Sequence, residues 1–228
     1  MGIFQLVAFD LDDTLYPERE FVHSGFMAVA QHLDDLGLID AESFFNTAAG
    51  FFAAGALGNI FDLALERLAV VFSAALIEEL VRVYREHPPQ IQPFAGSPRL
   101  LQLLKARGVV LALISDGPHP TQQNKLRALG LEAWFDHLMF TGAHGEAWGK
   151  PSPRAFQEVM GASGVPAAAC VYVADNPGKD FVAPNRLGWH TIRVREKIGL
   201  YREASPPPGG EPKATVNTFE GLWDLLSA

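Results

Sequence analysis

Three aspartates crowd into four positions directly after an apolar run near the start of the chain, in the sequence VAFDLDDTLYP at residues 7–17. The apolar run predicts a buried strand, and Asp10, Asp12 and Asp13 follow it at once. Carboxylates this close repel one another, and burying them costs several kcal/mol per ion unless another charge compensates. A fold that keeps this cluster therefore needs a compensating charge at the end of its first strand.

Length and composition limit the classes of protein to consider. The 228 residues are enough for one large domain or for a core domain with an insertion, and 48% of them are hydrophobic. A formal net charge of −8 argues against nucleic acid or an anionic membrane as a partner. Because the sequence shows neither a membrane-spanning apolar run nor a basic signal-peptide region, we expect a soluble cytoplasmic protein, with its oligomeric state left open.

Short apolar runs recur along the chain and predict strands at residues 4–9, 109–115, 137–142, 170–174 and 190–194. These runs do not alternate with polar residues, which is typical of strands buried on both faces of a parallel sheet. Helical stretches separate the later runs, and two of them begin with Ser-Pro, so Ser97 and Ser152 are predicted N-caps. This order predicts a doubly wound α/β fold with a mostly parallel sheet, ending in a short strand and a helix.

Nearly a hundred residues separate the first two predicted strands, and their pattern is helical and apolar. We therefore expect an α/β core domain made of residues 1–17 and 93–228, with a small helical domain of residues 18–92 inserted after the first strand. The apolar stretch at residues 50–61 is short and interrupted by glycines, so packed helices explain it better than a lipid-binding segment does.

Polar and charged side chains stand at four places where predicted strands end or helices begin. In a parallel α/β sheet, ligands bind beyond the carboxyl ends of the strands. A single Asp at such a place is commonly only a turn or cap residue, but a set at four places predicts one shared pocket. The residues concerned are Asp10, Asp12, Ser115, Asp116, Gly117, Lys150, Asp175 and Asp180.

The chemistry of this set indicates a metal and a phosphate. Clustered carboxylates call for a hard cation, and oxygen ligands favour Mg²⁺, which keeps several waters and binds phosphate oxygens. Lys150 would compensate further negative charge and attract an anion. Such a site would also balance the repulsion among the aspartates at the first strand.

Four motifs in the sequence resemble those of the haloacid dehalogenase superfamily of phosphohydrolases, and together they cover nearly the whole chain. DLDDT at 10–14 resembles its first motif, D-x-D-x-T, and LISDG at 113–117 resembles the second, a Ser or Thr that ends a hydrophobic strand. KP at 150–151 resembles the third motif, and ADNPGKD at 174–180 resembles the fourth, an acidic pair. The resemblance implies the family's α/β core, with the insertion as a helical cap of the C1 type.

The resemblance also implies a role for each residue. Asp10 would be the nucleophile that forms an aspartyl-phosphate, and Asp12 would be the general acid and then the general base, with Lys150 neutralising charge beside them. The implied metal ligands are Asp10, Asp12 through its backbone carbonyl, Asp175 and Asp180. The implied phosphate-binding residues are Thr14, Ser115, Asp116, Gly117 and Lys150.

We therefore expect a Mg²⁺-dependent phosphohydrolase that cleaves a small-molecule phosphate monoester, because a cap closes over small substrates. Asp12 argues against a dehalogenase, whose ester is hydrolysed without protonation of an alkoxide, and Thr14 argues less strongly against a phosphomutase. Two alternatives stay open: a phosphotransferase or phosphomutase of the same superfamily, and a non-catalytic regulatory binding module on this fold.

The sequence does not identify the phosphorylated metabolite. Lys179, next to the second aspartate of the fourth motif, is expected to be a solvated side chain. Position 116 holds Asp where the family often has Asn, and position 174 holds Ala where it often has Gly, and neither change removes a predicted ligand. Possible substrate contacts are Tyr16, Glu18, Arg19, His23 and Phe52.

Overall fold

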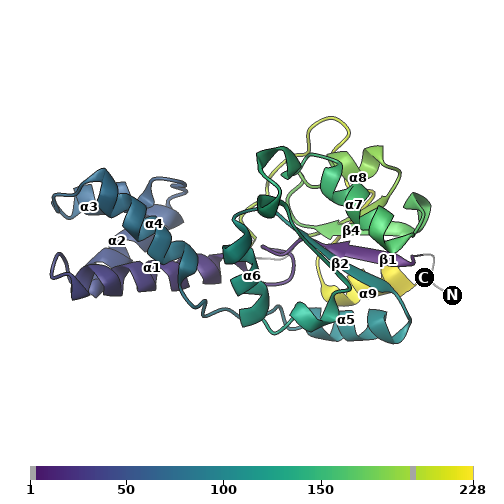
Figure 1. The fold of residues 1–228 in the computed structure, drawn as a ribbon, viewed down its shortest axis with the longest axis horizontal. Helices are drawn as coiled ribbons and strands as arrows, with labels where there is room; N and C mark the ends of the chain where they lie inside the picture. Colours follow the sequence, from purple (N-terminus) through teal and green to yellow (C-terminus); the bar gives the residue numbers. More distant parts are fainter. Residues whose placement is uncertain (1–3, 196–198, 228) are drawn as a thin grey trace. The chain divides into compact units, whose positions relative to one another are not determined.

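The computed structural model describes residues 4–195 and 199–227, and the chain divides into two compact units (Figure 1). The core unit consists of Met1–Arg19 together with Ile91–Ala228. The helical unit consists of Glu20–Gln90, so it interrupts the core unit in sequence.

The core unit is built on a six-stranded sheet in the order β3-β2-β1-β4-β5-β6, and every neighbouring pair of strands is parallel. The predicted doubly wound α/β fold is confirmed, and the five predicted apolar runs match strands to within two residues at each end. The strands are β1 (Leu6–Phe9), β2 (Val110–Ser115), β3 (His137–Phe140), β4 (Cys170–Ala174), β5 (His190–Val194) and β6 (Ala214–Val216).

Helices cover both faces of this sheet. In Figure 1, α7 (Arg154–Ser163) and α8 (Val182–Arg186) lie on one face, and α5 (Ser97–Ala106) and α9 (Phe219–Ser227) lie on the other. Helix α6 (His119–Ala128) follows β2 directly. Short 3-10 helices complete the connections at η1 (Glu132–Trp134), η2 (Thr141–Ala143), η3 (Glu146–Trp148) and η4 (Ala167–Ala169).

The apolar side chains of each strand are buried alternately on the two faces of the sheet. Leu6 and Ala8 of β1 belong to one buried cluster with Phe156 of α7. Val7 and Phe9 are also fully buried, and they point to the opposite face because successive side chains alternate along a strand. Both faces are covered, which is why the strands read as continuous apolar runs.

The prediction of Ser97 and Ser152 as N-caps is wrong. Gly96 holds the N-cap position before α5, and α7 begins after Pro153. The buried hydroxyl of Ser97 instead donates to the carbonyl oxygen of Leu15 at 3.1 Å. Its hydrogen bond therefore joins α5 to the loop after β1, a long-range contact that a local capping rule does not reveal.

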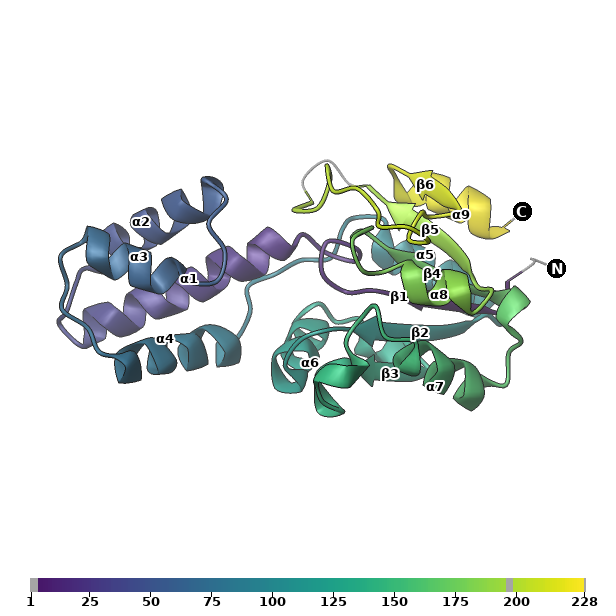
Figure 2. The same ribbon diagram turned by 90° about the horizontal axis from the view of Figure 1, so that it is seen from above.

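The helical unit is formed by helices in the stretch where the sequence pattern predicts them, and Figure 2 shows these helices gathered together. They are most of α1 (Glu18–Asp35), α2 (Ala41–Ala53), α3 (Ile60–Arg67) and α4 (Ala74–Glu86). Their apolar sides meet in a buried cluster that includes Phe26, Phe44 and Leu80. Phe61 belongs to the same cluster, so residues 50–61 contribute to packed helices, as predicted.

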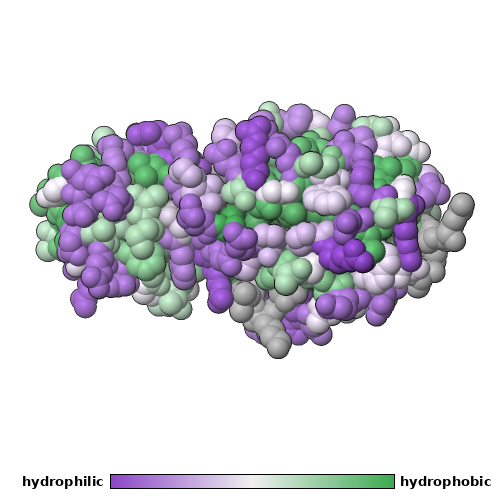
Figure 3. Space-filling model, turned by 90° about the horizontal axis from the view of Figure 1, so that it is seen from below, coloured by the Kyte–Doolittle hydropathy of each residue, from purple (hydrophilic) through white to green (hydrophobic). Residues whose placement is uncertain are grey.

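No helix in the described parts of the chain has the length and apolar character to cross a membrane. The 18-residue helix α1, for example, carries charged side chains at Glu18, Arg19 and Asp35. The face seen in Figure 3 mixes hydrophilic and hydrophobic residues, which is the usual condition of a protein surface.

Gly142 packs against another loop of the core unit, where an added Cβ would collide with the carbonyl oxygen of Gly117. We expect Gly142→Ala to lower the free energy of unfolding by about 1–3 kcal/mol, because backbone atoms must move to make room. The matched control is Gly161→Ala in α7, where a Cβ meets nothing within 4 Å and should stabilise the helix by about 0.5–1 kcal/mol. Urea unfolding measures the free energy of unfolding of both variants. Equal values for Gly142→Ala and Gly161→Ala would contradict this packing argument.

Candidate active site

The strand order brings the ends of three strands to one place. Phe9, the last residue of β1, is in register with Leu113 of β2 and with Val173 of β4. The backbone N–H that follows Phe9 donates to the carbonyl oxygen of Val173 at 2.9 Å, which extends this alignment beyond the strand. At this edge of the sheet lie Asp10 and Asp175, which directly follow β1 and β4, and Ser115, which is the last residue of β2.

Asp10, Asp175 and Asp180 form a buried group of carboxylates, with one oxygen of each within 4.8 Å of the others. Asp175 Oδ2 is buried, and no hydrogen-bond partner for it lies in the described parts of the chain. Buried polar atoms without a partner are uncommon and call for an explanation. Three carboxylates with such an oxygen among them fit a hard divalent cation such as Mg²⁺.

The pKa values of this carboxylate group reflect its burial. Burial, together with the charges of Asp10 and Asp180, raises the pKa of Asp175 to about 9. Burial also raises the pKa of Asp10 to about 6, against the opposing charge of Lys150. Repulsion among the three carboxylates contributes to both shifts, and it is the interaction that a bound cation would relieve.

Lys150 reaches into the carboxylate group from the loop before α7, and its side chain is fully buried. Its Nζ donates to Asp10 Oδ1 at 2.8 Å and lies 2.8 Å from Asp180 Oδ1. It also donates to the hydroxyl of Tyr172 at 2.9 Å, and that hydroxyl donates to the carbonyl oxygen of Ile114. Burial alone would lower the pKa of Lys150, but Asp10 and Asp180 raise it well above its ordinary value, so the ammonium stays charged.

Asp12 is engaged by a different set of donors. Lys125 Nζ donates to Asp12 Oδ1 at 2.8 Å, and Gln122 Nε2 donates to Asp12 Oδ2 at 2.8 Å. The hydroxyl of Tyr16 also donates to Asp12 Oδ1. Burial would raise the pKa of Asp12, but the charge of Lys125 and these hydrogen bonds outweigh it and lower the pKa below its ordinary value. Gln122 also donates to Ser115 Oγ at 2.7 Å, so it joins two residues that the sequence places in the site.

Asp116 is a carboxylate at the predicted phosphate site, but its charge is compensated. Lys179 Nζ lies 2.9 Å from Asp116 Oδ2, so the predicted solvated Lys179 is in fact half-buried and ion-paired. The other oxygen of Asp116 accepts hydrogen bonds from Thr141 Oγ1 at 2.9 Å and from the backbone N–H of Lys150 at 3.2 Å. Gly117 follows at a φ of 111°, in the left-handed region that glycine adopts most easily.

The third aspartate of the first motif holds the loop together. Asp13 has a φ of 50°, which Asp tolerates better than most residues do. Its carboxylate accepts hydrogen bonds from the backbone N–H groups of Glu18 at 2.8 Å and Leu200 at 2.7 Å. The neighbouring Thr14 is fully buried, and among the described residues its hydroxyl has no hydrogen-bond partner, so it lies inside the turn.

A cavity of about 230 Å³ opens over these residues. Its wall is mostly acidic, which suits a bound cation and disfavours an apolar ligand. Burial and the charge of Asp12 raise the pKa of Glu18, in this wall, to about 8. The lining residues are Asp10, Asp12, Glu18, Asp116, Gly117, Asp175, Asn176, Lys179 and Tyr201.

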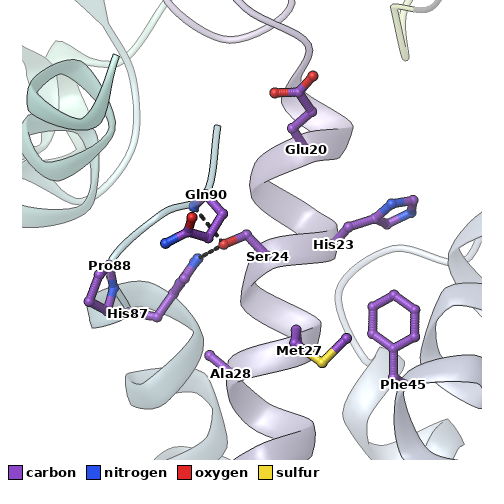
Figure 4. Close-up of a pocket in the computed structure, with 9 residues that line it drawn as sticks. All are labelled: Glu20, His23, Ser24, Met27, Ala28, Phe45, His87, Pro88 and Gln90. Carbon is purple, nitrogen blue, oxygen red and sulfur yellow. Dashed lines mark hydrogen bonds between the residues drawn. The ribbon is translucent and has the colours of Figure 1, made fainter. Parts of the chain in front are cut away.

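The helical unit has a cavity of its own, of about 460 Å³, shown in Figure 4. Ser24 Oγ accepts a hydrogen bond from the backbone N–H of Gln90 at 2.8 Å and lies 2.9 Å from His87 Nε2. His87 Nδ1 lies 2.6 Å from the carbonyl oxygen of Tyr84, which can only accept, so Nδ1 carries the hydrogen and Ser24 donates to Nε2. These hydrogen bonds join α1 to the segment after α4.

The five residues that the sequence indicated as possible substrate contacts lie in different settings. Tyr16 is fully buried and hydrogen-bonded within the site, and Glu18 lines its cavity. Arg19 is exposed. His23 lines the cavity of the helical unit, and Phe52 packs edge-on against its ring. Glu18 is therefore the one of the five placed at the wall of the charged cavity.

The chain is similar in sequence to known hydrolases. The sequence model of the haloacid dehalogenase-like hydrolases matches residues 4–188. The glyceraldehyde 3-phosphate phosphatase of Methanocaldococcus jannaschii is 28% identical over 224 residues, which cover 96% of each chain.

Two solved structures share the fold over almost the full length of both chains. A predicted phosphoglycolate phosphatase from Haemophilus somnus superposes with a TM-score of 0.69 at 20% identity, over 99% of each chain. A 2-haloacid dehalogenase from Pseudomonas syringae superposes with a TM-score of 0.65 at 22% identity, over 98% of each chain. The fold alone therefore does not separate these two reactions. The family match covers 81% of the chain and spans residues 10–180, where all four motifs lie. The chain is an enzyme and belongs to the haloacid dehalogenase-like hydrolases.

Proposed function

We propose that the chain is a Mg²⁺-dependent phosphohydrolase that cleaves a small-molecule phosphate monoester through an aspartyl-phosphate on Asp10. The supporting observation is the buried contact of Lys150 with Asp10, inside a three-carboxylate group at the edge of a charged cavity. The similarity to an enzyme named for its action on glyceraldehyde 3-phosphate makes three-carbon phosphate esters the first substrates to test.

In the first half of the reaction, a carboxylate oxygen of Asp10 attacks phosphorus and the ester P–O bond breaks. The negative charge of a bound phosphate favours protonation of Asp12. Asp12 then gives this proton to the leaving alkoxide, which is a poor leaving group without one. Lys150 neutralises charge on the nucleophile and the phosphoryl oxygens, and Ser115 with the backbone at Gly117 binds those oxygens. Mg²⁺ held by Asp10, Asp175, Asp180 and the backbone carbonyl of Asp12 would reduce the repulsion between carboxylate and phosphate dianion.

In the second half, water hydrolyses the phosphorylated Asp10, and Asp12 takes the proton that water loses. The carboxylate of Asp10 is regenerated and inorganic phosphate leaves. A phosphotransferase would instead pass the phosphoryl group to an acceptor hydroxyl, so measuring free phosphate against phosphorylated acceptor separates the two reactions.

We also propose that residues 18–92 serve as a cap of the C1 type. The insertion lies between the first two motifs in sequence, and its helices bury a core of their own. Caps of this kind exclude water from the reaction and select small substrates. The cavity at Ser24 and His87 is a candidate for part of this selection.

Replacing Asp10 by Asn should lower phosphate release at least about 10³-fold, because an amide cannot act as the nucleophile. The assay follows phosphate released from glyceraldehyde 3-phosphate and from p-nitrophenyl phosphate in the presence of Mg²⁺. Asp40→Asn is the matched control, since Asp40 caps α2 in the helical unit and Asn caps a helix equally well. Normal activity of Asp10→Asn would contradict the assignment of the nucleophile.

A chelator of divalent cations should abolish phosphate release, and excess Mg²⁺ should restore it, because the carboxylate group and the phosphate dianion repel each other. Asp175→Asn should weaken the restoration, since it removes one carboxylate from the site. Titration of Mg²⁺ into the chelated enzyme measures both effects. Full activity in the presence of chelator would contradict a metal-dependent reaction.

The raised pKa of Asp175 gives the metal-free protein a pH-dependent stability. In the unfolded chain this carboxyl ionises near its ordinary pKa of 3.8, but in the folded protein near 9. Between these values the unfolded state loses the proton first, so stability falls as pH rises, by up to about 1.4 kcal/mol per pH unit. Asp175→Asn should therefore stabilise the metal-free protein more at about pH 8 than at about pH 5. Thermal unfolding measures this difference, and an equal gain at both values would contradict it.

A further inference from the structure

The proposed mechanism gives no role to two side chains that hold the Asp12 carboxylate. Lys125 Nζ donates to Asp12 Oδ1 at 2.8 Å, and Gln122 Nε2 donates to Asp12 Oδ2 at 2.8 Å. The hydroxyl of Tyr16 is a third donor, also to Oδ1. Because both carboxylate oxygens accept hydrogen bonds, the geometry is that of an ionised carboxylate.

Lys125 and Gln122 are almost inaccessible to solvent, at 4% and 2% exposure. They lie three residues apart on α6, so they project from the same side of that helix. A buried ammonium is retained only where an opposite charge and hydrogen bonds compensate its desolvation, and Asp12 supplies both here. The side-chain amide of Gln122 donates both to Asp12 and to Ser115 Oγ, the latter at 2.7 Å. The orientation of Asp12 is therefore fixed by α6 rather than by solvent.

We propose that Lys125 and Gln122 are positioning residues that hold Asp12 as the base for hydrolysis of phosphorylated Asp10. This role rests on the proposed function of the site. In this step the water oxygen bonds to phosphorus, and the bond from phosphorus to Asp10 breaks, returning its electron pair to the Asp10 carboxylate. The proton of the water passes to Asp12, and inorganic phosphate is formed. A base for this step has to be charged and correctly oriented, which the two α6 side chains provide.

The substrate p-nitrophenyl phosphate isolates this half of the reaction, because its leaving group needs no proton from Asp12. In Lys125→Met and in Gln122→Met, kcat/KM should stay within about threefold of the wild type, since it reports only the steps up to phosphorylation of Asp10. Both kcat and KM should fall together by at least about tenfold, since general base catalysis contributes about 10²–10⁴-fold. Rapid mixing should show a burst of p-nitrophenolate equal to the active enzyme.

Two further variants serve as the positive reference and the matched control of this experiment. Asp12→Asn should show the same pattern of kcat and KM, with an equal or larger fall. Lys105→Met is the matched control, because it breaks the ion pair between Lys105 and Asp136 at 2.6 Å elsewhere in the core unit. It should leave both constants unchanged. KM does not depend on the fraction of folded enzyme, so a destabilised preparation still gives a valid comparison.

The outcomes separate the positioning role from the proposed function. If the wild type releases p-nitrophenolate in a Mg²⁺-dependent reaction but kcat/KM falls with kcat and no burst appears, Lys125 and Gln122 serve substrate binding or folding and the positioning role is wrong. Unchanged kinetics in both variants overturn it as well. A wild type with no Mg²⁺-dependent turnover of any phosphate ester contradicts the proposed function itself.

Discussion

The buried contact between Lys150 and Asp10 is the interaction on which the arrangement of the site depends. Three carboxylates at one edge of a sheet repel one another, and desolvation adds several kcal/mol per ion. An ammonium held within hydrogen-bond distance offsets part of this cost, and Tyr172 fixes it from the neighbouring strand. The parallel sheet makes this possible, because it brings the carboxyl ends of β1, β2 and β4 to the same edge.

The sequence predicts the strands well because each is a continuous apolar run with polar residues at its end. It also predicts that Asp10, Lys150 and Asp175 lie at one edge of the sheet, where the structure has them. This succeeds because the ends of the strands can be recognised in the amino-acid sequence, and a parallel sheet brings these ends together. Tyr172 cannot be found in this way, because it reads as one more apolar residue of a buried strand. Lys125 is hidden for a related reason, since a lysine on a helix normally marks the solvent-exposed side.

The three aspartates of the loop after β1 have different roles although they lie within four positions of one another. Asp10 faces Lys150, Asp12 is held by α6, and Asp13 accepts backbone hydrogen bonds that fix the loop. Their backbone conformations decide this division, since the left-handed conformation at Asp13 turns the chain between the strand and α1. A motif gives the residue types, whereas only the three-dimensional course of the loop tells which carboxylate meets which partner.

The long insertion also orders events during synthesis of the chain. Leu6 of β1 pairs with Val110 of β2, so the first strand leaves the ribosome long before its partner exists. The helical unit, by contrast, closes its core through contacts within Glu20–Gln90. Local contacts form fastest, because they require the smallest loop closures. We therefore infer that the helices collapse first during translation and that Asp180 completes the carboxylate group only late in synthesis.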